Sequence, residues 1–335
     1  MCRSAMVANG RRKPMKALIG LLICAGGALG AAGAWAQSYP AKTVRVVVGF
    51  SAGSTTDLIG RVLAQKMTEA LAQSVIVDNR PGAGGNLAAE LVAKAAPDGY
   101  TLLLANAGIA TGATAYVKLN FNALRDFAPV TQVSATPHVL VTHPSLPARS
   151  VKELIAFARA RPGELNFAST GHGNSDHLAA ELLSFMTGLK MVHVAYKGGP
   201  QALAEVVSGQ VALYFPGAPS GMPFIRPGRV RALGVTGAKR AAVLPEVPTI
   251  AEAGVPGYEH ILWSMLLVPA ATPKEIVARL NREALKALEA ADLRERYANM
   301  GVEAVGTTLE QAGAYLKSET AKYAKVVKVI GLRIE

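Results

Sequence analysis

Apolar runs of strand length alternate with stretches of helical period along most of the chain. Residues 55–73 place Leu58, Val62 and Met67 on one face of a helix, and residues 175–187 have the same period. Such alternation predicts parallel sheets that helices cover on both faces. The predicted strands are 44–50, 74–79, 101–106, 165–170, 191–196, 211–217, 230–237 and 261–269.

The strands and helices fall into two sets, residues 40–110 and 150–237. A long non-helical segment, 126–150, separates the sets, and a second extended run, 261–269, precedes two helices that close the chain. We therefore expect an α/β fold of two Rossmann-like lobes, joined by two crossing strands, with a ligand cleft between them. The expected boundaries are 37–138 plus 261–335 for the first lobe and 139–260 for the second.

The first 36 residues have the pattern of a secretory signal peptide. Residues 11–16 are basic, residues 17–34 are apolar and small, and Ala34-Trp35-Ala36 offers a cleavage site after Ala36. A membrane anchor is the alternative, but the run is rich in Gly and Ala and falls short of the ~20 strongly apolar residues that a span needs. Met15 could replace Met1 as the start of the chain.

Composition narrows the function classes. Removing residues 1–36 removes both cysteines, Cys2 and Cys24, so stability must come from an ordinary buried core without disulfides. The same step removes five of 35 basic residues and no acidic one, which leaves 30 against 23, a net charge of +7. This mild surplus lacks the basic and aromatic clusters of nucleic-acid binding and suits small anions. We expect a monomer that binds no nucleic acid.

The stretch "VRVVVGFSAGSTTD" (44–57) runs from a strand into a loop of small residues. Gly49 to Gly53 match G-x-S-x-G, the nucleophile elbow of serine hydrolases, but that elbow follows several strands and this loop follows the first. An exported hydrolase using Ser51 therefore stays as an alternative. The favoured interpretation is that small residues let a ligand approach the main chain, where amides opening a helix at Thr55 or Thr56 bind an anion.

A similar strand, Gly-rich loop and helix start occur in "LNFASTGHGNSDHLAAELL" (165–183). Two anion-binding loops, one in each lobe and facing a cleft, would suit a ligand with carboxylate groups. The histidines have neither cysteine partners nor the close His/Asp/Glu spacing of a metal site, so we predict no metal and no cofactor.

Several ordered motifs carry a family resemblance. The chain resembles the substrate-binding proteins of tripartite tricarboxylate transporters, the Bug receptor family, over nearly all of 39–335. The resemblance implies a periplasmic solute-binding protein of type II topology, which closes over a dicarboxylate, tricarboxylate or aromatic acid and delivers it to membrane permease subunits. The matching pieces include "YPAKTVRVVVGFSAGSTTDLIGR" (39–61), "VDNRPGAGGNLAAELVAKAAPDGYTLL" (77–103), "GHGNSDHLAAELL" (171–183), "VAYKGGPQAL" (194–203) and "LPEVPTIAEAGVPGYE" (244–259).

The resemblance also implies ligand-binding residues, in two loops of the first lobe and in the second lobe. Departures from the family pattern include Ala212 and Pro216, where acidic residues are common, and their absence argues against an amino-acid ligand. The implied residues are Phe50, Ser51, Ala52, Gly53, Thr55, Thr56 and Asp57, then Ala83, Gly84, Gly85 and Asn86, and in the second lobe Thr170, Gly171, His172, Gly173, Asn174, His177 and Tyr196.

Two roles and one function stay open. His172 either donates to a ligand carboxylate or lies in solvent, and His177 is a local cap or packing group in the favoured interpretation. A periplasmic ligand sensor that reports to a membrane signalling partner is the alternative to a transport receptor, because the surface that would contact such a partner has no recognisable pattern.

Overall fold

The computed structural model describes residues 39–334. Residues 42–335 form one compact unit. The expected signal peptide (1–36), its cleavage after Ala36 and the choice between Met1 and Met15 lie outside the described residues. Within residues 39–334, no helix combines the length and the hydrophobicity that crossing a membrane requires.

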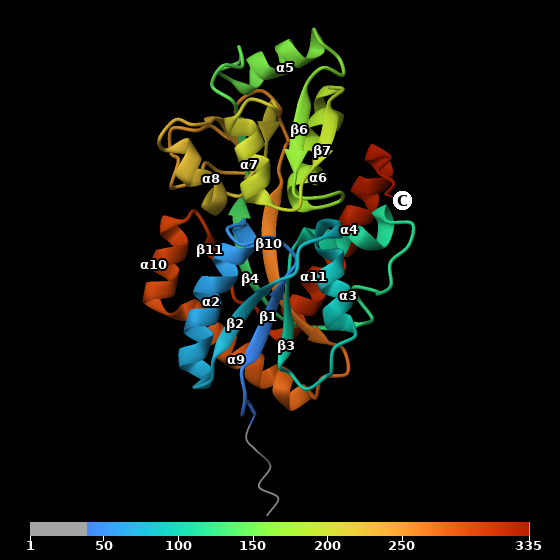
Figure 1. The fold of residues 1–335 in the computed structure, drawn as a ribbon, viewed down its shortest axis with the longest axis vertical. Helices are drawn as coiled ribbons and strands as arrows, with labels where there is room; N and C mark the ends of the chain where they lie inside the picture. Colours follow the sequence, from blue (N-terminus) through green and yellow to red (C-terminus); the bar gives the residue numbers. More distant parts are fainter. Residues whose placement is uncertain (1–38, 335) are drawn as a thin grey trace, which may run out of the picture. The chain divides into compact units, whose positions relative to one another are not determined.

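A six-stranded sheet forms the core of the lower half of Figure 1. Its order is β11-β4-β10-β3-β1-β2, and α3, α4 and α11 cover one face while α2 and α9 cover the other. Strands β1 and β3 lie inside the sheet and are buried along most of their length, whereas β2, at the edge, is buried only at Val75. The strands are β1 (Val44–Val48), β2 (Val75–Asn79), β3 (Thr101–Ala105), β4 (Phe127–Pro137), β10 (Ile261–Pro269) and β11 (Glu303–Ala304).

The helices of this half connect or follow those strands. Ser54 and Asn106 cap α2 and α4 by accepting from backbone amides, which fixes where each helix begins. The elements are α2 (Thr55–Leu71), the short 3-10 turn η1 (Ala83–Gly85), α3 (Asn86–Ala93), α4 (Ala107–Ala115), α9 (Lys274–Glu289), α10 (Ala291–Asn299) and α11 (Leu309–Ile330).

A five-stranded sheet, in the order β7-β6-β8-β5-β9, forms the upper half. Helices α5 and α6 pack against one face and α7 and α8 against the other, around two separate apolar clusters. The elements are β5 (Val139–Thr142), α5 (Val151–Arg159), β6 (Asn166–Ser169), α6 (Ser175–Thr187), β7 (Val192–Ala195), α7 (Gly199–Val207), β8 (Leu213–Tyr214), α8 (Ala218–Ile225) and β9 (Arg231–Val235).

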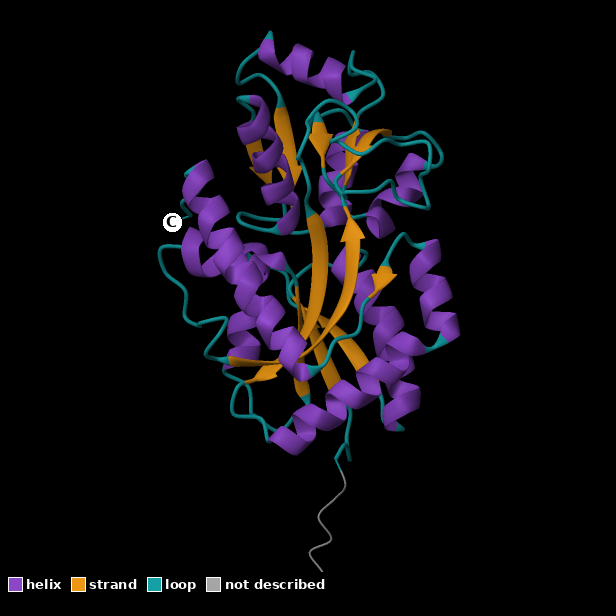
Figure 2. Cartoon of the chain, turned by 180° about the vertical axis from the view of Figure 1, so that it is seen from behind, coloured by secondary structure: helices purple, strands orange, loops and turns teal. Residues whose placement is uncertain are grey.

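The chain passes between the sheets twice. Strands β4 and β5 belong to different sheets and are separated by His138 alone, and β10 returns the chain to the first sheet at Ile261. Figure 2 shows the crossing strands from behind. The α/β fold of two lobes joined by crossing strands is confirmed. We propose that these crossings bound the lobes, with residues 139–260 as the second lobe and the flanking segments as the first.

Two expectations were wrong in detail. The sheets are mixed, because β10 runs antiparallel to β3 and β4, and β5 runs antiparallel to β8 and β9. Each of these strands enters its sheet from the other lobe and so runs against the local βαβ strands. The chain also closes with three helices and a short strand instead of two helices, because Ala290 has extended backbone angles (φ −61°, ψ 129°) and separates α9 from α10.

A histidine lies at each crossing, and one serine joins them. His138 Nε2 lies 2.8 Å from Ser175 Oγ, and His260 Nε2 lies 2.9 Å from the same oxygen. All three residues are buried. Burial lowers the pKa of His138 to about 4 and that of His260 well below 6.5, so both rings are neutral at pH 7. The first turn of α6 is thereby fastened to both crossing strands.

Removing Glu319 should destabilise the first lobe. Trp263 on β10 donates from Nε1 to Glu319 Oε2 on α11 at 2.8 Å, and both side chains are buried. We expect Glu319→Ala to lower the free energy of unfolding by about 2–3 kcal/mol, because the indole N–H loses a charged acceptor. Urea unfolding followed by fluorescence is the measurement, since Trp263 is the only tryptophan after residue 36.

Two further variants control this experiment. Glu319→Gln keeps an acceptor oxygen and should cost less than Glu319→Ala. Glu295→Ala removes an exposed carboxylate that forms no ion pair within residues 39–334, and it should change stability by less than about 0.5 kcal/mol. Equal losses in Glu319→Ala and Glu295→Ala would contradict the role of this hydrogen bond.

The buried His138 should make stability depend on pH. Below pH 6.5 the unfolded chain binds a proton at this ring, whereas the native protein binds it only near pH 4. Its contribution to stability is therefore fully present above pH 6.5 and is lost as the pH falls towards 4, by about 3 kcal/mol in total. The stability difference between wild type and His138→Asn, measured by urea unfolding at pH 7 and pH 5, should shrink by about 2 kcal/mol. A difference that does not change with pH would contradict this, and His143→Asn, outside the hinge, serves as the control.

Candidate functional site

The first loop links β1 to α2 and is held by the carboxylate of Asp57. This carboxylate accepts from Gly53 N at 2.9 Å, Asn79 Nδ2 at 2.8 Å and Arg61 Nε at 3.0 Å. Its side chain is 1% exposed. Asp57 therefore shapes the loop and does not line the cleft cavity described below.

The second loop links β6 to α6 and has the same construction. The carboxylate of Asp176 accepts from Thr170 N at 2.8 Å and from His177 N at 2.9 Å. Burial raises the pKa of Asp176. In each lobe a buried carboxylate in the first turn of a helix thus ties back the preceding loop.

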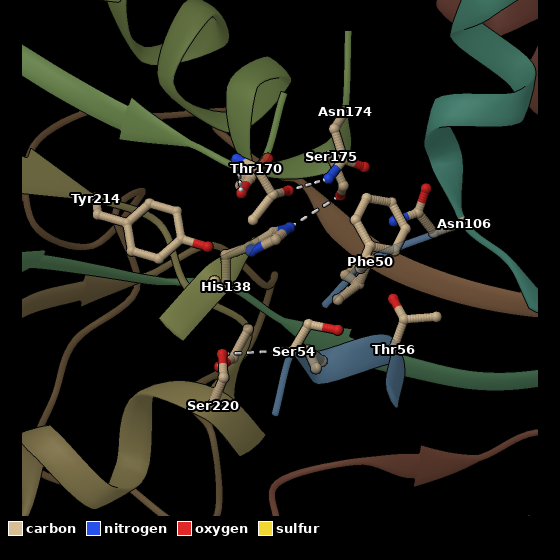
Figure 3. A pocket seen from close by; sticks show the side chains of 15 residues that line it. Phe50, Ser54, Thr56, Asn106, His138, Thr170, Asn174, Ser175, Tyr214 and Ser220 are labelled. Carbon is tan, nitrogen blue, oxygen red and sulfur yellow. Dashed lines mark hydrogen bonds between the residues drawn. The ribbon is translucent and has the colours of Figure 1, made fainter. Parts of the chain in front are cut away.

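The two loops meet at one small cavity, the cleft cavity, with a volume of about 30 Å³. Side chains from both lobes face one another across it (Figure 3). This volume is enough for one or two water molecules, so the lobes are closed on one another. The cavity is lined by Phe50, Ser54, Thr55, Thr56, Asn106, His138, Thr170, Asn174, Ser175, Asp176, Gly199, Tyr214, Gly217, Ser220 and Leu262.

Neutral donors dominate this lining, and none of its described residues is Lys or Arg. The N-termini of α2 and α6 both open onto it, with Ser54 and Asn174 as the capping residues. The side chain of Asn174 makes no cap hydrogen bond: its Nδ2 donates to Thr170 Oγ1, and within residues 39–334 its Oδ1 is buried without a hydrogen-bond partner. The His177 amide is bonded to Asp176, but unlike Ser54 the Asn174 side chain leaves the amides of Ser175 and Asp176 to a ligand.

Direct contacts hold the lobes together around the cavity. Thr55 Oγ1 lies 2.9 Å from Ser220 Oγ, and Thr111 Oγ1 donates to Gly173 O at 2.8 Å. The Tyr116 hydroxyl lies 3.1 Å from Ala83 O and 3.0 Å from His172 O, one carbonyl in each lobe. Closure is thus maintained mainly through backbone carbonyls and hydroxyls.

Main chain also meets main chain between the lobes. A Cβ added to Gly171, which has a φ of +128°, would lie 2.9 Å from Gly84 Cα. On the other side of the cleft, a Cβ added to Gly198 would lie 1.7 Å from Ser51 Oγ. Both lobes therefore need residues without a side chain where they touch.

The residues expected to bind ligand are divided among several places. Phe50, Thr55, Thr56, Thr170 and Asn174 line the cleft cavity. A second small cavity is lined by Gly84, Gly85 and Asn86, together with Phe50, and a third of about 220 Å³ borders Ala83, Gly84, Thr170, Gly171, His172 and Tyr196. Ser51, Ala52, Gly53, Asp57, Gly173 and His177 line none of these three.

Ser51 abuts Gly198 of the other lobe, as described above. In residues 39–334 its hydroxyl forms no hydrogen bond with a histidine or a carboxylate, which is the contact that would activate it as a nucleophile. The structure thus offers no geometric support for a Ser51 hydrolase.

The histidines of the second loop form a stack. His177 Nδ1 accepts from Gly173 N at 3.0 Å, and its ring centroid lies 3.9 Å from that of His193. His172 is exposed and meets the His193 ring edge-on at 4.6 Å. Burial lowers the pKa of His193 to about 3. His177 therefore caps and packs the loop, and within residues 39–334 no three His, Cys, Asp or Glu side chains are placed to hold a metal ion.

The expected set omitted much of the lining. Asn106 follows β3 directly, at the carboxyl end of a parallel strand where ligands of α/β proteins bind, so its position was a usable signal. Ser54, Ser175 and Asp176 belong to the two helix starts that were expected to bind ligand, so the same local pattern marks them. The remaining residues come from the hinge or from other segments of the second lobe, and no local pattern marks them. The omitted residues are Ser54, Asn106, His138, Ser175, Asp176, Gly199, Tyr214, Gly217, Ser220 and Leu262.

Comparison with known proteins matches this architecture. An R. palustris protein solved with adipate superposes with a TM-score of 0.85 at 37% identity, over 88% of this chain and 99% of that one. The periplasmic binding protein BugD gives 0.85 at 30% identity, over 89% of this chain and 100% of that one. MatC from Rhodopseudomonas palustris, solved with bound malate, gives 0.81 at 32% identity, over 86% and 100%.

A family profile covers most of the chain as well. Residues 59–332 match the family described as the tripartite tricarboxylate transporter family receptor. The matched segment includes strands and helices of both lobes and both crossing strands. The chain belongs to the receptor family of the tripartite tricarboxylate transporters, the TctC or Bug solute-binding proteins.

Proposed function

We propose that this protein captures a small carboxylate in its cleft in the periplasm and delivers it to permease subunits of a tripartite transporter. Adipate and malate are present in the solved structures of two relatives. The observation that carries the proposal is the meeting of two helix N-termini, one from each lobe, at a single cavity whose lining is mostly polar and uncharged.

Helix N-termini can bind a carboxylate without a basic side chain. Their free amides point along the helix axis and carry about half a positive charge, so an anion is stabilised there. The hydroxyls of Thr55 and Thr56 in the first lobe and of Thr170 in the second add further donors. Asp57 and Asp176 hold the loops, so the donors are in place before the ligand arrives.

Binding requires the lobes to open and close. The cleft cavity of about 30 Å³ cannot contain a dicarboxylate, so the lobes must separate for the ligand to reach the amides. The ligand first meets one lobe, and rotation about the crossing strands then brings the other onto its far end. Each charge-assisted hydrogen bond contributes about 1.5–3 kcal/mol, so a handful gives micromolar affinity after ordering costs.

The lining favours plain acids over amino acids. Ala212 and Pro216 stand where the family commonly has acidic residues, so no carboxylate from β8 reaches the cleft. Asp176 is the one acidic residue that lines the cavity within the described chain, and two backbone amides already occupy its carboxylate. An ammonium group would therefore find no free acceptor of opposite charge. Dicarboxylates, tricarboxylates and aromatic acids fit better.

The location and the partner are inferred from the sequence and the family. The pattern of residues 1–36 favours export and cleavage after Ala36. In the periplasm the closed form would present a surface built from both lobes to the permease subunits. Crosslinking of the ligand-loaded protein in intact cells tests this step, and capture of a signalling protein in place of permease subunits would assign a sensor function.

A thermal-shift screen tests carboxylate binding directly. The chain from Gln37 onward is heated with adipate, malate, citrate, benzoate, nicotinate and glutamate. A ligand with micromolar affinity at millimolar concentration should stabilise the native state by about 4 kcal/mol, which appears as a clear rise in Tm. A rise in Tm with one class of acid supports the proposal. An unchanged Tm with every acid of the panel, measured on folded protein, contradicts it.

Variants at the helix starts locate the site. Asn174→Ala and Thr56→Ala should each weaken binding of the acid about tenfold, the equivalent of about 1.4 kcal/mol, while the circular dichroism spectrum stays unchanged. Asn299→Ala, at an exposed position on α10, is the matched control and should bind like wild type. Unchanged affinity in both cleft variants would count against these loops as the ligand site.

A further inference from the structure

A larger cavity, the rear groove, lies at the crossing strands outside the cleft. It has a volume of about 500 Å³, within the usual range for small-molecule sites. Residues 237–242 of the second lobe form one wall, and Ala298 with residues 301–303 of the first lobe forms the other. Ala135, Pro137 and Ile261 form its apolar floor.

The groove and the cleft border the same two crossing strands. Pro137 and Ile261 are paired in the sheet and line the rear groove, whereas the residues that follow them in the chain, His138 and Leu262, line the cleft cavity. The crossing strands therefore contribute to both cavities, and their hinge motion affects both.

The width of the groove depends on how the lobes are placed. Its walls belong to different lobes, and at one end they already touch, since a Cβ added to Gly301 would lie 2.7 Å from Val243 Cγ2. The groove exists at this size in the arrangement that closes the cleft. A molecule that fills it stabilises that arrangement over any in which the walls have moved.

The charges at the rim indicate which molecule would bind. Arg240 is paired with Glu252 at 2.9 Å. Lys239, Glu259 and Glu303 are exposed and form no ion pair within the described chain, which leaves two carboxylates against one ammonium. Glu259 belongs to the second lobe and Glu303 to the first, so each lobe contributes one carboxylate.

We propose that the rear groove is a second ligand site, which takes a small apolar amine in its cationic form and favours the closed cleft. The apolar body lies on the floor of Ala135, Pro137 and Ile261, and the ammonium meets the carboxylates of Glu259 and Glu303. Bound there, the amine raises the affinity of the cleft for its acid, and the acid raises the affinity for the amine by the same factor.

Binding of 2-phenylethylammonium to the chain from Gln37 onward tests the site without involving the cleft. We expect saturable binding by calorimetry or ligand-observed NMR, weakened at least fivefold in Glu259→Gln/Glu303→Gln. The matched control, Glu246→Gln/Glu295→Gln, removes two exposed carboxylates without an ion pair in the described part of the chain and should bind like wild type. The anion 3-phenylpropionate should not compete. Three results would overturn the site: no binding of 2-phenylethylammonium at about 10 mM, equal binding in both double variants, or competition by the anion.

The coupling is tested separately and rests on the proposed carboxylate function. Saturating 2-phenylethylammonium should raise the affinity for the acid found by thermal shift at least threefold. Ala238→Trp, which fills the groove from the wall of the second lobe, should abolish amine binding and reproduce the gain in acid affinity. Unchanged acid affinity under both conditions would overturn the coupling. If no acid binds at all, the carboxylate function fails while the amine titration still decides on the groove.

Discussion

The antiparallel pairing of β4 with β10 is the contact on which both lobes depend. These strands are the only described route by which the chain passes between the sheets, and they pair from Pro137 and Ile261 down to Phe127 and Pro269. Where they leave the first sheet, Ser175 joins His138 to His260. A twist of this ribbon is therefore transmitted directly to the first turn of α6, where the ligand is proposed to bind.

The cleft cavity is lined by few charged side chains. The buried carboxylates of Asp57 and Asp176 are occupied by backbone amides and shape the loops, and the lining within the described chain contains no basic side chain. In the proposed function, helix amides and hydroxyls are then the donors for the acid. Such a site has little electrostatic preference among carboxylates. The length and shape of the acid must therefore decide which ligand allows the lobes to close.

The sequence predicted the fold well, because strand and helix periods are local signals. Helices 55–73 and 175–187 and all eight strand runs correspond to elements of the structure. The antiparallel direction of β10 was missed, because it depends on which lobe a strand comes from. Strands β4 and β5 lie in the segment 126–150 and were not among the predicted strands. Only the part of the site that lies in the two loops was predicted, because Thr56 and Asn174 belong to a strand, small-residue loop and helix start that the sequence shows. Tyr214 and Ser220 reach the cavity only through tertiary packing.

The contact between Gly171 and Gly84 bears on how long a ligand stays bound. On this side of the cleft the main chains of the two glycines lie against each other. Beside them, the Tyr116 hydroxyl contacts the carbonyl oxygens of Ala83 and His172. Even one methyl group at Gly171 would hold the lobes apart and leave a gap through which water and ligand exchange. For the proposed carboxylate ligand, the residence time then depends on a contact between the lobes that need not touch the ligand, and receptors with identical binding loops could release the same acid at very different rates.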